Sequence, residues 1–377
     1  MAPLFDNPGY NSDVCHVGLG RKDVLTHSPG RVKPQHLILI TITRHTLTVG
    51  TDCSGLGAPL VALRELGVQF NHVFSCEKDP VAQLCLAANF RPQKMFHDIT
   101  DWARKRRAGY TDLYISGFPC QPFSTQGRRQ GFGDSRSDIF SHIIRHIRRQ
   151  KPRAFVLENV VGLKSIDQGR CYQFVMAALE GLGSYNIYVE TINPETFKIP
   201  QHRPRLFFIG VLRSFDKGFC RPQGSRDKGS LEALLLPRLR TPRATDLPWK
   251  ATARENVIKC MSLLSAKGLR PRMRCYVINC DSSRGRCHYM KNRSQCLTAN
   301  RRLGHWLTNR GRYMNLVEMM LLQGFPLWYK VPPKVRSRKF AGMLGNSMCV
   351  GVLRPLLREV LRAARLKRCL FCSRGHN

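Results

Sequence analysis

Short apolar runs, several of them ending beside a polar or reactive residue, constrain the fold of this chain more than any other feature. Unbroken runs of this kind are typical of buried strands in an α/β sheet, and they occur at residues 47–51, 73–76, 112–116, 154–160 and 206–212. The first run leads into a glycine-containing turn and a helix pattern, with Pro59 in its first turn and Gly67 at its end. This succession predicts an α/β fold whose ligands collect at the carboxyl ends of the strands.

A cysteine, a glutamate and two arginines lie next to these runs. Cys120 comes shortly after the run at 112–116, and Glu158 lies near the end of the next run. If these two strands are parallel neighbours, both side chains lie at the same edge of the sheet. Arg203 and Arg205 precede the last run and share one face if that stretch is extended. We therefore expect one site with a nucleophilic thiol; the alternatives are an inert buried thiol and a surface ion pair.

The motifs around these residues occur in a fixed order. They are Gly117-Phe118-Pro119-Cys120-Gln121-Pro122-Phe123-Ser124, Glu158-Asn159-Val160, Gln201-x-Arg203-x-Arg205 and Gly345-Asn346-Ser347. In this order they resemble the cytosine carbon-5 DNA methyltransferases, over about residues 47–212 and 294–365. The resemblance implies an α/β, Rossmann-like methyltransferase sheet with helices on both faces, together with a small target-recognition domain.

The resemblance also implies a role for each reactive residue. In the family a cysteine adds to carbon 6 of cytosine, so Cys120 would be the nucleophile. Glu158 would hydrogen-bond or protonate the ring nitrogen, which requires burial to raise its pKa. Arg205 would hold the exocyclic oxygen, and Arg203 would brace the loop or a phosphate.

The first glycine turn predicts a nucleoside site. Glycines let the backbone approach a ligand closely, and Glu77 follows the strand at 73–76, about 20 residues further on, where a ribose-binding acid belongs. By the resemblance the ligand is S-adenosyl-L-methionine, and its expected contacts are Cys53, Ser54, Gly55, Gly57, Glu77, Asp98, Ile99, Pro119, Ile139, Asn346 and Ser347.

Two positions depart from the family pattern. Thr51-Asp52-Cys53 stands where an acidic, an apolar and an aromatic residue are usual, and Ala58 stands where a third glycine is common. We expect the cofactor still to bind, without the aromatic side chain that packs on its adenine.

Residues 125–136, between the cysteine and the glutamate, are rich in glycine and arginine. The resemblance implies a lid that closes over a flipped cytosine, whereas the alternative is a solvated connection. The residues expected to contact the nucleic acid are Gln121, Ser124, Arg128, Arg136 and Gln201.

The charge of the chain predicts a polyanionic partner. It has 61 Lys and Arg against 25 Asp and Glu, a formal net charge of +36. Together with the resemblance, this leads us to expect double-stranded DNA as the partner and a nucleus, or a nucleoid in a prokaryote, as the location. No run of about 18 apolar residues occurs, which argues against a membrane span. We also expect the protein to be a monomer.

Composition divides the chain into four regions. We expect an N-terminal extension at 1–46, a catalytic and cofactor-binding domain at 47–212, a target-recognition domain at 213–293, and at 294–377 a return to the catalytic domain with a last helix and a basic tail. A helix pattern at 253–267 and a Cys-rich segment at 274–296 fit a domain that reads a major groove. The alternative for 213–293 is a largely flexible, electrostatic region.

Two groups of cysteine and histidine raise the question of zinc. They are Cys275, Cys280, Cys287, His288 and Cys296, and separately Cys369, Cys372 and His376. Neither group has paired ligands at standard finger spacing, so we expect free thiols and no metal.

Three functions remain open from the sequence. The first is DNA cytosine methylation. The second is methylation of cytosine in tRNA, against which the large basic insert argues. The third is a non-catalytic relative that binds nucleic acid, which the presence of the cysteine, the glutamate and both arginines disfavours.

Overall fold

The structure, a computed structural model, describes residues 46–101, 107–119 and 137–366, all within one compact unit that begins at His45. A seven-stranded sheet forms its centre, in the order β3-β2-β1-β4-β5-β8-β6. Its strands are β1 (Leu47–Asp52), β2 (Phe70–Cys76), β3 (Lys94–Phe96), β4 (Leu113–Gly117), β5 (Ala154–Val160), β6 (Tyr185–Ile192) and β8 (Arg205–Leu212). The five strands predicted from apolar runs are thereby confirmed, and β3 and β6 are added to them.

The direction of β8 brings the start of that strand to the edge of the sheet where the parallel strands have their carboxyl ends. Strands β1 to β5 are parallel, whereas β8 runs antiparallel between β5 and β6. Only a 3₁₀ turn, η4 (Pro194–Phe197), and the short strand β7 (Gln201–His202) join β6 to β8, and a parallel return needs a longer crossover. Val160, at the end of β5, therefore pairs with Arg205, at the start of β8.

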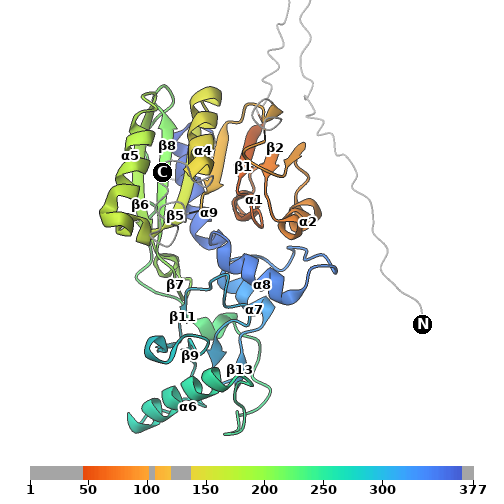
Figure 1. Ribbon diagram of the computed structural model, residues 1–377, viewed down its shortest axis with the longest axis vertical. Coiled ribbons are helices and arrows are strands. Elements are labelled where there is room, and N and C mark those ends of the chain that lie inside the picture. Colours follow the sequence, from red (N-terminus) through yellow and green to blue (C-terminus); the bar gives the residue numbers. More distant parts are fainter. Residues whose placement is uncertain (1–45, 102–106, 120–136, 367–377) are drawn as a thin grey trace, which may run out of the picture. The chain divides into compact units, whose positions relative to one another are not determined.

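Helices cover both faces of the sheet (Figure 1). On one face lie α1 (Ala58–Glu65), α2 (Pro80–Asn89) and α9 (Val350–Ala363), and on the other lie α4 (Ser137–Gln150) and α5 (Arg170–Glu180). Val49 and Ile115 point into the first core, whereas Tyr114 and Phe155 point into the second, as alternation along strands requires. This arrangement confirms the predicted α/β class with helices on both faces.

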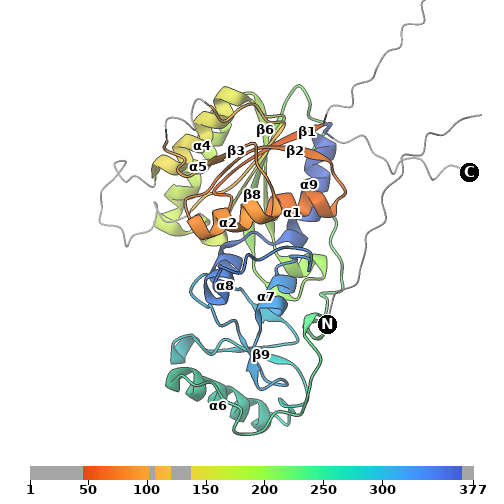
Figure 2. The same cartoon turned by 90° about the vertical axis from the view of Figure 1, so that its right-hand side faces the viewer.

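The chain returns to the sheet through its last two helices, α8 (Ser337–Asn346) and α9. The predicted last helix is confirmed, and α9 packs beside α1 in the same core (Figure 2). Residues Ser337–Ala363 are long and apolar enough to cross a membrane, but the stretch is mostly buried inside the protein and breaks between α8 and α9. The stretch therefore has the length and apolar composition that are also typical of core helices in a globular domain.

A second, smaller core lies in the part of the chain that follows the large sheet. The predicted helix is present as α6 (Ala251–Ala266), and it packs on a four-stranded sheet in the order β10-β9-β12-β13. The elements of this part and its connections are η5 (Leu231–Leu234), β9 (Tyr276–Ile278), η6 (Arg284–Arg286), β10 (Tyr289–Lys291), β11 (Ser294–Gln295), β12 (Trp306–Leu307), β13 (Arg312–Tyr313) and α7 (Leu316–Leu322). Because Trp306 and Tyr313 belong to this core, it extends beyond the residue 293 at which we expected it to end.

Candidate active site

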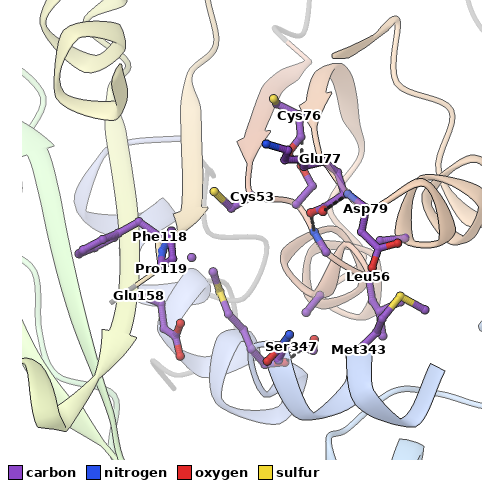
Figure 3. Close-up of a pocket in the computed structure, with 18 of the residues that line it drawn as sticks. Cys53, Leu56, Cys76, Glu77, Asp79, Phe118, Pro119, Glu158, Met343 and Ser347 are labelled. Atoms are coloured by element: carbon purple, nitrogen blue, oxygen red, sulfur yellow. Dashed lines mark hydrogen bonds between the residues drawn. The ribbon is translucent and has the colours of Figure 1, made fainter. Parts of the chain in front are cut away.

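A cavity of about 720 Å³ opens at the carboxyl ends of β1, β2, β4 and β5, where the start of β8 also lies. Figure 3 shows Glu77 on one side of it and Glu158 on another. Most of the predicted site residues line it: Cys53, Ser54, Gly55, Glu77, Asp98, Ile99, Pro119, Ile139, Glu158, Arg203, Arg205, Asn346 and Ser347. The edge of the sheet therefore brings the predicted cofactor-binding residues and the predicted catalytic residues into one cavity.

The turn after β1 fixes the carboxylate of Glu77. The backbone N–H of Gly55 donates to its Oε2 at 2.7 Å, and the N–H of Asp79 donates to its Oε1 at 2.9 Å. Gly57, at φ +70°, ends the turn, and an added Cβ would meet Leu86 at 2.9 Å. Each carboxylate oxygen still has a lone pair available, so Glu77 is held in place with room to accept further hydrogen bonds.

Asp98 supplies a second fixed negative charge in this half of the cavity. It accepts hydrogen bonds from the backbone N–H and the hydroxyl of Thr100, both at 2.8 Å, and pairs with Lys78 at 3.6 Å. The hydrogen bond from the Thr100 backbone is the largest influence that lowers its pKa, so Asp98 stays ionised. Ile99, beside it, is buried.

Cys53 lines the cavity where the family pattern has an aromatic residue. Burial, and next the nearby charge of Glu77, raise the pKa of its thiol to about 12, so the thiol is neutral. Its backbone lies in the left-handed region at φ 51°. Sequence reasoning did not include Lys78, His97, Met343 or Met348 among the lining residues. The position of Lys78 directly after Glu77 could have predicted that Lys78 lines the cavity.

Glu158 lies near the carboxyl end of β5, next to β4. It pairs with Gly117 across the parallel β4–β5 ladder, which confirms that the two strands are parallel neighbours. Its Oε1 lies 3.2 Å from Nε of Arg205, and only 12% of its side chain is exposed. Burial raises the pKa of Glu158, while the charges of Arg205 and Arg203 lower it, and burial is the larger effect. The site therefore holds a carboxyl group that keeps its proton more readily than an exposed glutamate.

The two arginines lie at the same edge but use their donors differently. Arg203 is buried, and its guanidinium donates to Leu297 O at 2.6 Å, Gly345 O at 3.0 Å and Ser347 O at 2.7 Å. Arg205 donates to Pro204 O at 2.8 Å and faces Glu158. Arg203 thus ties together Leu297 and Ser347, 50 residues apart along the chain, whereas Arg205 faces the carboxyl group of Glu158.

Gln201 does not lie where it could contact nucleic acid. Its side chain is fully buried, donates to Leu322 O at 3.1 Å and to Gln323 Oε1 at 3.3 Å, and accepts from the N–H of Leu297 at 3.2 Å. All these partners belong to the returning chain, so Gln201 holds the two parts of the fold together. The other predicted nucleic-acid contacts, Gln121, Ser124, Arg128 and Arg136, and the predicted nucleophile Cys120 lie outside the described residues.

The cysteines of the small core do not form a metal centre in the described part of the chain. There, no three His, Cys, Asp or Glu side chains gather as metal ligands, and the thiols are free. Cys260 and Cys287 lie 3.6 Å apart, sulfur to sulfur. The second predicted group, Cys369, Cys372 and His376, lies outside the described residues.

Comparisons with known proteins agree with this geometry. The family model described as C-5 cytosine-specific DNA methylase matches residues 52–362. The chain is 29% identical to the type II methyltransferase M.HaeII of Haemophilus aegyptius, over 83% of this chain and 92% of that protein. It is 30% identical to M.NlaX of Neisseria lactamica, over 82% of this chain and 95% of that protein.

A solved structure supports the same fold. The methyltransferase Dnmt2 of S. pombe superimposes with a TM-score of 0.59 at 20% identity, covering 84% of this chain and 98% of its own. The sequence relatives named above come from bacteria, so they give no support to the nuclear location expected from the sequence. The chain belongs to the family of C-5 cytosine-specific DNA methylases.

Proposed function

We propose that this protein is a DNA cytosine-5 methyltransferase that uses S-adenosyl-L-methionine and a covalent adduct through Cys120. The observation that carries the proposal is one cavity that holds the buried Glu158–Arg205 pair and also Glu77, fixed by two backbone N–H groups. An acid beside a guanidinium suits a base ring, and a fixed carboxylate suits a ribose. Membership of the family makes cytosine in DNA the substrate to test first.

The residues around Glu77 fit S-adenosyl-L-methionine. Glu77 would accept the ribose hydroxyls, and Asp98 with Ile99 would flank the adenine, beside the small thiol of Cys53. Asn346 and Ser347, at the end of α8, would meet the other end of the cofactor. When bound, the cofactor supplies an activated methyl group. We expect a roomy adenine end, because a thiol fills less space than an aromatic ring.

On the catalytic side, each residue of the chain would have a separate role. The thiolate of Cys120 would add to carbon 6 of a flipped cytosine, which breaks the carbon 5–carbon 6 double bond and moves its electron pair into the ring toward carbon 5 and the ring nitrogen. Glu158 would donate a proton or a hydrogen bond to the ring nitrogen as negative charge builds there. Arg205 would donate to the exocyclic oxygen, and Arg203 would keep the edge rigid through its three backbone carbonyl partners.

We propose double-stranded DNA as the partner and the small core as its reader. Residues 213 to 313 hold the second core, and the chain has a formal net charge of +36 that favours binding to phosphates. Residues 125–136, expected from the sequence to form a lid over the flipped base, lie outside the described residues. We further propose that the protein acts as a monomer and, because the relatives named above come from bacteria, that it acts on nucleoid DNA.

The test is methyl transfer from labelled S-adenosyl-L-methionine to mixed duplex DNA, by the protein and by its Cys120→Ser variant. We expect label at carbon 5 of cytosine within one short sequence, and none with the variant, which should still bind the cofactor. Base-resolution sequencing locates the product. Transfer to a tRNA competitor in place of DNA, or cofactor binding with no transfer to either, would reject the proposal.

A further inference from the structure

Cys296 contacts both arginines of the candidate active site, Arg203 and Arg205. Its Sγ lies 3.1 Å from Nη1 of Arg203 and 3.5 Å from Nη2 of Arg205, and its own thiol donates to Leu297 O at 3.2 Å. Cys296 is not among the residues that line the cavity. Among the described residues, it is the only side chain to which both guanidinium groups donate.

We propose that Cys296 is a positioning residue that holds Arg205 in line with Glu158 by tying its guanidinium to the fixed guanidinium of Arg203. The inference rests on the proposed function, because that function assigns Arg205 to the reaction. It adds a residue outside the four motifs that carry the family resemblance.

The distribution of donors shows why Arg205 needs this contact. Arg203 is immobilised by three backbone carbonyls, so it is a firm reference point. Arg205 has one partner for each of its three nitrogens: Glu158, Pro204 O and the sulfur of Cys296. Pro204 is the preceding residue and moves with Arg205. Within the described residues, Cys296 is therefore the one tie, apart from Glu158, between this guanidinium and a distant part of the chain.

The tie to Cys296 also persists when the tie to Glu158 weakens. An arginine attracts an ionised carboxylate more strongly than a protonated one, and the proposed mechanism needs Glu158 protonated. The thiol is held by the Leu297 carbonyl, and its attraction for Arg205 does not depend on the protonation of Glu158. The sulfur of Cys296 can thus keep Arg205 in place in the state that reacts.

The first test compares Cys296→Ala and Cys296→Ser with Cys220→Ala, which removes an exposed thiol. We expect the alanine variant to lose about tenfold in kcat, because one donor of Arg205 loses its acceptor, with the KM for the cofactor unchanged. The serine variant keeps an acceptor and should retain most of the rate, and Cys220→Ala should match the parent protein.

The pH profile separates positioning from packing. If Arg205 swings away in Cys296→Ala, its charge lowers the pKa of Glu158 less, so the alkaline limb of kcat moves to higher pH. A thiol that only fills space would lower the melting temperature and leave this limb where it is. An alanine variant with the parent kcat and the parent pH profile would overturn the inference.

A second measurement is independent of activity. Isotope-labelled arginine reports rotation of each guanidinium by NMR, with the Arg205 signal assigned through Arg205→Lys. We expect slow rotation of Arg205 in the parent protein and faster rotation in Cys296→Ala. If the parent protein transfers no methyl group to DNA but this difference is present, the proposed function fails and the positioning role stands. Equal rotation in both proteins would reject the positioning role.

Discussion

Glu158 is subject to two opposing influences on its protonation. Burial raises its pKa, whereas the guanidinium of Arg205, 3.2 Å away, and the charge of Arg203 lower it. Because burial is the larger influence, the group keeps its proton to a higher pH than an exposed glutamate does. An acid that keeps its proton more readily than an exposed glutamate, and is next to a fixed cation, is suited to stabilising charge on a base ring.

The first prediction concerns Glu158→Gln, which keeps the shape of the side chain but has no acidic proton. We expect kcat to fall about 100-fold while the affinity for the cofactor stays unchanged. In the parent protein, kcat should fall as pH rises through the pKa of Glu158, because the ionised form cannot donate; the variant should lack this limb. Rate measurements across pH with calorimetry of cofactor binding check both. A variant that retains the alkaline limb would assign that limb to another group.

At the level of single residues, the sequence predicted identities better than environments. The spacing around Glu77 and Glu158 was enough to place both at one sheet edge, because strand ends are local features. Gln201 belongs to the same kind of motif, yet it is buried against Leu322 and Gln323. That burial depends on contacts between segments more than 120 residues apart, which no local pattern contains.

Among the secondary-structure elements, unbroken apolar runs were decisive. They predicted β1, β2, β4, β5 and β8, because strands buried on both faces are apolar throughout. Strand β6 lies at the edge, and most of its residues are only half-buried, so it gives no such run. The strands of the small sheet are two or three residues long, too short for a periodic signal. The antiparallel direction of β8 follows from the short connection between β6 and β8, which contains no crossover helix. The apolar run of β8 itself does not indicate this direction.

Contact between α8 and the segment before it leads to the second prediction. A Cβ on Gly345 would overlap the backbone of Thr298 and Ala299, and neither can move as a side-chain tip does. Gly345→Ala should therefore destabilise the protein by about 1–3 kcal/mol and lower kcat, since Gly345 O also anchors Arg203. Gly285→Ala is the matched control, because nothing lies within 4 Å of its added Cβ. Urea unfolding measures both, and equal stabilities would mean that α8 shifts without cost.

At the scale of the whole molecule, we expect two buried histidines of the described residues to make folding sensitive to acid. His72 on β2 and His305 near β12 are buried, and burial is the largest cause that lowers the pKa of each from 6.5 to about 4. Nδ1 of His72 and Nε2 of His305 have no hydrogen-bond partner among the described residues. The folded protein thus keeps both rings neutral at a pH where the unfolded chain protonates them.

The last prediction gives the sign and the size of this effect. Between pH 6.5 and about 4 the unfolded chain binds more protons, so the free energy of unfolding should fall as pH falls. Near pH 5 each histidine should cost about 2 kcal/mol relative to neutral pH. Urea unfolding at a series of pH values tests this, with His305→Asn expected to reduce the slope and the exposed His288→Asn to leave it unchanged. If His305→Asn has the same slope as the parent protein, the His305 ring does not link acid to unfolding. The surroundings of His305 would then be more polar or better hydrated than its burial implies.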